Sequence, residues 1–283
     1  MRNKDKEENT KKYVLSSLYT LGKFIGIGWI IVTPVVIFTF GGNFLDNRLN
    51  LGYLMTLLGL MIATGAAAGL LAGLLGVGGG IVIVPVLEFA LGLLGVDPAI
   101  RMHVAVATSL ATIIPTSLSS SRAHHRREAV DFSLMRRWAG PIFLGAVIGV
   151  WAAAQVDSRV LSVIFGVVAA LVAVKMMLPL DNKQIADDVP RGILSPVLPI
   201  GIGAVSSMMG IGGGTVAVPL MTLMGQSVHR AVGTAALFGL FISLPGTFGF
   251  MVAGWDVAGR PPGSVGYVNL VGFLIISPMT VWM

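Results

Sequence analysis

Two glycine clusters with matching spacing are the strongest candidates in this chain for a binding site. They lie at 76–80 and 210–214, and Pro85 follows the first at the same distance as Pro219 follows the second. Glycine allows positive φ and close backbone approach, so each cluster can end one helix and begin another with unpaired amide groups. Because such amides attract negative charge, the clusters predict a binding site for a small anion. The glycines expected to form it are Gly76, Gly78, Gly79, Gly80, Gly210, Gly212, Gly213 and Gly214.

Tight packing of helices through small residues is the alternative for any single glycine. Hydroxyl groups extend the candidate site, because Thr108 and Ser109 lie in the middle of an apolar run and Thr234 matches Thr108 in a second run. Such hydroxyls either hydrogen-bond a dehydrated oxyanion or bond back to the carbonyl four residues earlier in their own helix. The sequence leaves both readings open.

Three titratable residues and two prolines are candidates for coupling or gating. Glu88 is the only acidic residue well inside an apolar run, so it either couples proton movement or lies at a helix end near water. His103 and His229 open corresponding helices, where imidazole either gates an anion or caps a helix at the membrane interface. Pro115 and Pro245 predict kinks that either act as hinges or accommodate a neighbouring helix.

No catalytic site, metal site or cofactor is predicted. The chain has no Cys and only four His, which argues against a structural zinc site. The first cluster lacks the Lys of a phosphate-binding loop and the acidic partner of a dinucleotide fingerprint. The serines at 117 and 119–121 are interpreted as polar residues at a helix end, and His124 and His125 as loop residues.

The composition is that of a chain embedded in lipid. Apolar residues make up 55% and charged residues 11%, against roughly 25% charged in soluble domains, and the mean hydropathy is +0.86. An ordinary soluble globule, a disordered chain, collagen and a coiled coil are excluded. The runs free of charged residues are 24–45, 49–87, 102–121, 138–156, 160–174, 192–229, 231–255 and 261–283.

Two of these runs, 49–87 and 192–229, are about twice the ~20 residues that one crossing needs. Each must fold back on itself or hold a full span and a shorter one, and each contains a glycine cluster near its middle. Ala105–Thr108 then matches Ala231–Thr234, and Pro115 matches Pro245. The chain is therefore interpreted as an internal duplication. Such repeats in transporters commonly surround a central site.

The basic residues predict the orientation. If the N-terminal segment is cytoplasmic, only Arg48, Arg101, Arg159 and Arg260 of the 19 Lys and Arg residues lie outside. This bias follows the positive-inside rule and accounts for the net charge of +6 without a nucleic-acid partner. An odd number of crossings separates the repeats, so the second half is expected to be inverted.

The fold class predicted is an all-α polytopic membrane protein with two homologous, inverted repeats and broken helices at the centre. The predicted segments are a cytoplasmic basic segment (1–23), an additional transmembrane helix and loop (24–50), repeat one (51–178), a cytoplasmic linker (179–191) and repeat two (192–283). Run 261–283 matches the span that begins at Trp138, and nothing follows it to match 160–178. We therefore expect repeat two to lack its last helix.

The chain resembles the TauE/SafE family of sulfite and organosulfonate exporters or permeases over about residues 54–283. The resemblance implies a carrier in the inner membrane for small, often sulfur-containing anions, with the two glycine motifs near the translocation path. The motifs that carry it are Gly73–Gly80 with Val84-Pro85, Ala107–Leu110, Val130-Asp131, Pro141–Gly149, and Gly210–Gly214 with Val218-Pro219.

These features predict a secondary transporter of small anions, such as sulfite, an organosulfonate or a carboxylate, that works by alternating access. The expected partners are the small anionic substrate and the lipid bilayer, without nucleic acid, and a homo-oligomer is compatible with the sequence. A non-transporting membrane scaffold is the main alternative. A membrane-embedded enzyme is a minor one, because no nucleophile-and-base motif or paired carboxylates are found.

Overall fold

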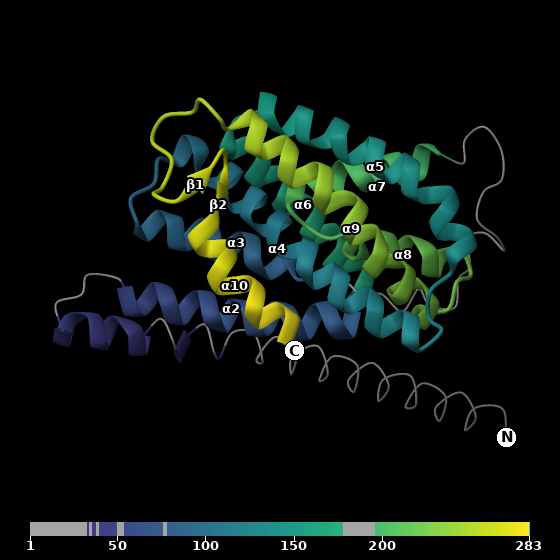
Figure 1. Cartoon of the computed structure of the whole chain (residues 1–283), viewed down its shortest axis with the longest axis horizontal. Coiled ribbons are helices and arrows are strands. Elements are labelled where there is room, and N and C mark those ends of the chain that lie inside the picture. Colours follow the sequence, from purple (N-terminus) through teal and green to yellow (C-terminus); the bar gives the residue numbers. More distant parts are fainter. Residues whose placement is uncertain are drawn as a thin grey trace, which may run out of the picture.

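The computed structural model describes residues 40–49, 54–75, 78–177 and 196–282, together with residues 33, 36 and 37. The predicted segments 1–23 and 179–191, and Gly76 of the first cluster, lie outside these residues. Apart from one small hairpin, the regular structure with printed bounds is helical (Figure 1), and the all-α class is confirmed. The helices are α2 (Leu54–Leu75), α3 (Gly80–Leu93), α4 (Pro98–Arg126), α5 (Phe132–Gln155), α6 (Ser158–Met177), α7 (Val197–Met209), α8 (Gly214–Leu223), α9 (Val228–Ala253) and α10 (Leu270–Trp282).

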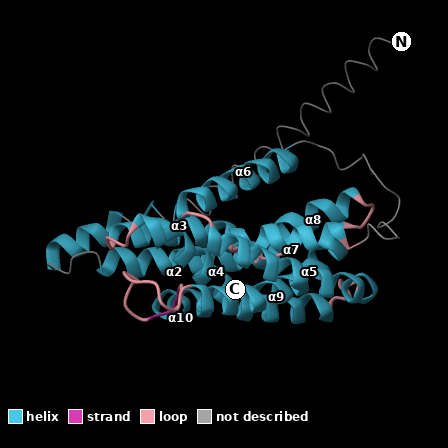
Figure 2. Ribbon diagram, turned by 90° about the horizontal axis from the view of Figure 1, so that it is seen from above, coloured by secondary structure: helices cyan, strands magenta, loops and turns pink. Residues whose placement is uncertain are grey.

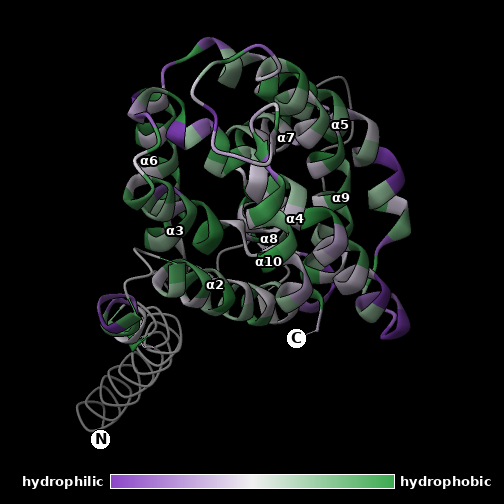
Figure 3. Cartoon of the chain, turned by 60° about the vertical axis from the view of Figure 1, so that its left-hand side comes forward, coloured by the Kyte–Doolittle hydropathy of each residue, from purple (hydrophilic) through white to green (hydrophobic). Residues whose placement is uncertain are grey.

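Four of the described helices, α2, α4, α5 and α9, are long and apolar enough to cross a membrane. The helices α3, α6, α7, α8 and α10 are apolar but have shorter apolar stretches. Hydrophilic residues gather at helix ends and in loops, while the helix bodies are mostly hydrophobic (Figure 3). This distribution fits helices whose sides face lipid or one another.

Both long apolar runs break within their glycine clusters, as their length and spacing predict. In the first, Gly78 and Gly79 adopt positive φ of 76° and 73° between α2 and α3. Helix α3 then runs back along α2, because Ala90 and Val86 pack on Leu57 and Leu60, near the start of α2. The first run is therefore a full span followed by a shorter helix that folds back.

The second break joins two shorter helices. Helix α7 ends at Gly210, whose φ is 68°, and the amides of Gly210 and Ile211 donate to the carbonyls of Ser207 and Ser206. This is the usual left-handed glycine ending of a helix. Helix α8 starts four residues later, at Gly214.

Helices α4 and α9 form an antiparallel pair in the core. A Cβ atom at Gly246 would meet Leu110, one at Gly239 would meet Ser117, and one at Gly233 would meet Ala129. As the residue number falls along α9, the number of the contacted residue rises along α4 and the turn that follows it, so the two helices run in opposite directions. The small residues on α9 let the two helices approach closely.

Two further helix pairs pack closely through glycines, α5 with α7 and α2 with α10 (Figure 1). A Cβ at Gly145 or Gly149 would press on the α7 backbone at Ile200 or Ala204. A Cβ at Gly65 or Gly69 would likewise press on α10. In the sequence alignment of the halves, α2 and α5 match α7 and α10, so inverted repeats would produce this arrangement. The repeat and its inversion stay predictions, as do the segment boundaries drawn above.

Two sequence-based expectations about local structure are wrong. Run 261–283 is not one helix: a two-stranded hairpin, β1 (Ser264–Val265) and β2 (Val268–Asn269), precedes α10. Figure 2 shows this hairpin beside α10. Positive φ at Gly263 and Gly266 turns the chain there. His124 and His125 lie in the last turn of α4, not in a loop.

Candidate functional site

The two glycine clusters meet at the centre of the molecule. A Cβ atom at Gly78 would lie 2.9 Å from the Cα atom of Gly212. A Cβ atom at Gly80 would strike the Gly210 carbonyl oxygen and lie 2.8 Å from the Cα atom of Ile211. Only glycine fits such an approach, so part of each cluster serves packing, the alternative raised from the sequence. We refer to the Gly78–Gly212 approach as the glycine contact.

Two helix N-termini begin beside the glycine contact. Helix α3 starts after Gly79 and α8 after Gly213, and neither has a side-chain cap or an acidic residue in its first turn. Buried Ser109 donates its hydroxyl hydrogen bond to the Gly210 carbonyl oxygen over 2.7 Å and holds the second cluster against α4. The positive ends of two helix dipoles thus lie near the same point, and the first turns of both helices carry no carboxylate to neutralise them.

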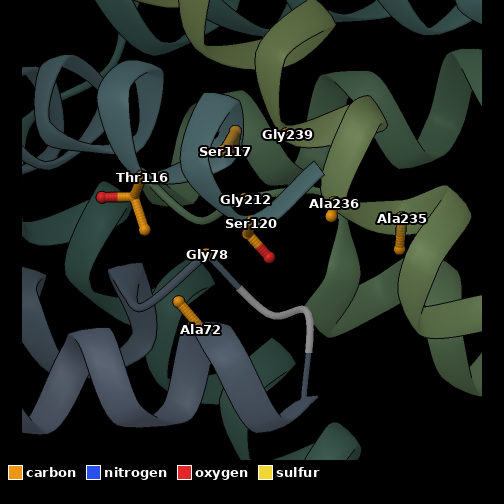
Figure 4. Close-up of a pocket in the computed structure, with 9 residues that line it drawn as sticks. All are labelled: Ala72, Gly78, Thr116, Ser117, Ser120, Gly212, Ala235, Ala236 and Gly239. Carbon is orange, nitrogen blue, oxygen red and sulfur yellow. The ribbon is translucent and has the colours of Figure 1, made fainter. Parts of the chain in front are cut away.

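A narrow space adjoins the glycine contact (Figure 4). It has no room for a water molecule. The polar groups that line it come from α4, and small side chains or glycines form the rest. Its lining residues are Ala72, Gly78, Thr116, Ser117, Ser120, Gly212, Ala235, Ala236 and Gly239.

A larger cavity of about 280 Å³, which we call the vestibule, shares Ala72, Thr116 and Ser120 with this narrow space. One wall is the C-terminal part of α4, with Thr116, Ser119, Ser120, Ala123, His124 and the adjoining Arg127. The facing walls are small or apolar and come from α2 (Gly69, Leu70, Ala72, Gly73) and α10 (Thr280, Val281). The vestibule thus adjoins the glycine contact through a constriction.

Thr108 and Thr234, expected as possible oxyanion ligands, make matched contacts elsewhere. The Thr234 hydroxyl oxygen accepts a hydrogen bond from the Asp131 amide over 2.9 Å, and the Thr108 hydroxyl accepts one from the Asn269 amide, also over 2.9 Å. Asp131 and Asn269 each precede a helix and accept from the amide three residues on. These threonines therefore position the starts of α5 and α10.

Glu88, His103 and His229 are spread over the molecule. Glu88 is half-buried on α3 and does not line the vestibule, while His229 is exposed at the start of α9. His103 is buried, and its Nε2 atom lies 3.1 Å from the carbonyl oxygens of both Ala153 and Val156 at the end of α5. This is a capping contact of the kind raised from the sequence. The gating and coupling roles of these residues stay predictions.

An aromatic cluster covers His103. The imidazole stacks on Tyr267 with ring centres 5.1 Å apart, and Phe250 meets both rings edge-on. Burial raises the pKa of Tyr267, which lies in the turn of the hairpin. Pro115 and Pro245 lie inside the helices α4 and α9. The kinks expected at these prolines stay predictions.

Sequence reasoning missed the polar wall of the vestibule. Thr116, Ser120 and His124 are spaced four residues apart, and Arg127 follows three residues later, so they share one face of a helix. That spacing is visible in the sequence. The shared helix face was missed because His124 and His125 are interpreted from the sequence as loop residues, which ends the helix too early.

Comparison with known proteins agrees with this architecture. Residues 60–283 match the family model described as sulfite exporter TauE/SafE. A probable membrane transporter protein of Haemophilus influenzae is 34% identical over 79% of this chain and 85% of its own. The probable membrane transporter protein YunE of Bacillus subtilis is 30% identical over 69% of this chain and 78% of its own. No solved structure shows a significant match.

The match covers both glycine clusters, the antiparallel α4–α9 pair and the polar wall of the vestibule. Together with four apolar helices of membrane-spanning length, it identifies a multi-pass membrane protein. The chain belongs to the TauE/SafE family of membrane transporters.

Proposed function

We propose that the protein is a secondary transporter of a small anion, with its central site at the glycine contact. The observation that carries the proposal is the convergence of two uncapped helix N-termini on a point that a polar cavity adjoins. Amide groups and dipoles at helix N-termini stabilise negative charge where lipid excludes water. Sulfite, an organosulfonate or a small carboxylate is the substrate class that such a site suits.

The mechanism proposed is alternating access. The vestibule adjoins the constriction, and the space at the glycine contact is too narrow for water. An anion would enter the vestibule, pass the constriction as it widens and bind at the two helix N-termini. The two halves of the protein would then rock against each other and open the site to the opposite face of the membrane. No phosphate-binding loop is present in the sequence, so an ion gradient or the membrane potential supplies the energy. Location in the inner membrane with a cytoplasmic N-terminus belongs to the same proposal.

Uptake by proteoliposomes tests this function. Labelled sulfite and labelled ethanesulfonate are offered with and without an imposed ion gradient, and at least one should accumulate only when the protein and the gradient are present. No flux of either anion through intact protein would favour the membrane scaffold. Product analysis of the same samples checks for chemical conversion, which would favour an enzyme.

The site itself is probed with a single cysteine, since the chain has none of its own. Gly78 is unsuitable because a Cβ atom there would collide with Gly212. Ala72 already carries a Cβ atom and lines both the narrow space and the vestibule. Modification of Ala72→Cys by a bulky thiol reagent should stop uptake, whereas Ala139→Cys, half-buried on α5 and outside both spaces, should be unaffected.

A further inference from the structure

The polar wall of the vestibule is a continuous stripe on one helix. Thr116 lies beside the constriction, Ser120 and His124 follow at successive turns, and Arg127 stands at the other end. At 1.5 Å per residue the stripe is about 16 Å long. The Thr116 hydroxyl is already engaged, because it bonds the Thr112 carbonyl and the Thr280 hydroxyl. No such bond engages the Ser120 hydroxyl or the Nδ1 atom of His124.

Two polar atoms of this stripe are buried without a hydrogen-bond partner. They are Nδ1 of His124, a residue only 7% exposed, and the hydroxyl oxygen of Ser120. Leaving a buried polar atom unpaired is unfavourable, and each such atom in a native protein calls for an explanation, such as a ligand. Both residues line the vestibule, so a molecule bound there can supply the missing partner.

The charges around these two atoms favour a bound molecule that is negatively charged. Arg127 lines the vestibule one turn beyond His124, and both Arg127 and His229 of α9 interact electrostatically with the imidazole. The imidazole also has a hydrogen-bond partner in the Gly73 backbone of the facing helix α2, which leaves Nδ1 as its unpaired atom. An imidazole N–H, a hydroxyl and a guanidinium are all hydrogen-bond donors, and a guanidinium matches the oxygens of a carboxylate or sulfonate well.

We infer that Ser120, His124 and Arg127 form a second oxyanion site in the vestibule, separate from the glycine contact. If the proposed function holds, this site receives the substrate anion before it reaches the constriction. Its ligand is an oxyanion head group that accepts from Nδ1 of His124, from the Ser120 hydroxyl and from the Arg127 side chain. The small and apolar α2 wall leaves room for the remainder of an organic anion.

The test uses a reporter cysteine that is not itself a ligand. Ser119 lines the vestibule, so Ser119→Cys in the purified full-length protein should react with trimethylammonioethyl methanethiosulfonate. Ethanesulfonate is the probe anion, and its concentration for half-maximal protection of the cysteine is measured. In His124→Gln and Arg127→Gln that concentration should rise about tenfold, which corresponds to about 1.4 kcal/mol, because each substitution removes a donor to the charged head group.

Arg126→Gln is the matched control. Arg126 neighbours Arg127 in sequence and is exposed, but it does not line the vestibule. It should leave protection unchanged, and equal weakening by the two arginine substitutions would overturn the site in favour of a diffuse basic surface. Absence of protection in the parent reporter would also overturn it. Thermal stabilisation by ethanesulfonate, compared between Arg127→Gln and Arg126→Gln without the reporter, provides a second measurement with the same expected contrast.

The uptake assay separates this inference from the proposed function. Protection that depends on His124 and Arg127, with no flux of any tested anion, would support the oxyanion site and contradict the transporter function. Flux through the parent protein, with protection that neither substitution changes, would support the transporter function and contradict the oxyanion site. Absence of both flux and protection would contradict both proposals.

Discussion

Helix α4 carries a buried histidine near each end, and the two ends differ in what surrounds the imidazole. Near the start, His103 contacts two carbonyl oxygens of α5 and is covered by Tyr267 and Phe250. We call this the sealed end. Near the finish, His124 lines the vestibule instead of packing under aromatic rings. The Nδ1 atoms of both imidazoles lack a hydrogen-bond partner among the described residues, so the two ends differ in the space around the ring.

The comparison teaches that the core is closed on one side and hollow on the other. Aromatic rings pack together at the sealed end, whereas the lining of the vestibule includes glycines, serines and two threonines. Large rings exclude water and hold helices together, while small polar residues leave space that water or a ligand can enter. A one-sided opening of this kind is what a carrier needs in one of its two states.

The largest effect is expected from crowding the approach of Gly80 to the second cluster, beside the glycine contact. Gly80→Ala would push a Cβ atom into the Gly210 carbonyl oxygen and toward Ile211. We expect a loss of about 3 kcal/mol in the free energy of unfolding, as for an overpacked core, and loss of uptake. Thermal unfolding of the purified protein measures the first.

Gly140→Ala on α5 is the control, because a Cβ atom there meets nothing within 4 Å. It should be neutral or slightly stabilising, since alanine favours helix over glycine by about 1 kcal/mol. If the two substitutions had the same effect, the glycine contact would be looser than the structure indicates.

A second prediction concerns two hydroxyls that the predicted inverted repeat would place opposite the vestibule. In the repeat alignment Ser206 matches Ala72 and Thr247 matches Ser117, and the hydroxyls of both are buried without a partner. If alternating access holds, these residues line the opposite route in the other state. Cysteines at 206 and 247 should react at least tenfold more slowly than Ser119→Cys at rest, a margin equivalent to about 1.4 kcal/mol.

During turnover driven by an anion gradient, the same two cysteines should become more reactive and Ser119→Cys less so. Equal reactivity in both conditions would contradict rocking of the halves. The reagent must be impermeant and applied from each side in turn, so that the measurement also reports the orientation of the vestibule.

Breaking the sealed end should cost stability without touching the vestibule. His103→Ala removes the ring that bonds the carbonyls of Ala153 and Val156 and stacks on Tyr267. We expect a loss of about 2 kcal/mol from the unpaired buried groups, measured by thermal unfolding. His229→Ala is the control, because that exposed side chain should change stability by less than about 0.5 kcal/mol.

Particular residues show what the sequence could predict. The breaks near Gly78 and Gly210 followed from run length and glycine content, since a backbone that turns inside a membrane needs both. The bonding of Thr108 and Thr234 to the residues that begin α10 and α5 could not be foreseen, because it depends on how distant helix ends meet. The vestibule wall was missed because α4 extends into a basic segment, where charge suggested a loop and packing against α9 continued the helix.

The smallest effect expected is a pH dependence confined to the sealed end. Burial raises the pKa of Tyr267, so the folded protein favours the neutral phenol. The resulting contribution to stability is complete below the pKa of an exposed phenol, about 10, and is lost as the pH rises through the higher folded value. Tyr267→Phe should therefore remove part of the fall in thermal stability above about pH 10. Phe250→Leu, which weakens the same aromatic cluster but keeps the phenol, should lower stability at every pH and retain the fall. An unchanged pH profile in Tyr267→Phe would mean that the phenol reaches water, and that the end of α4 described as sealed is open.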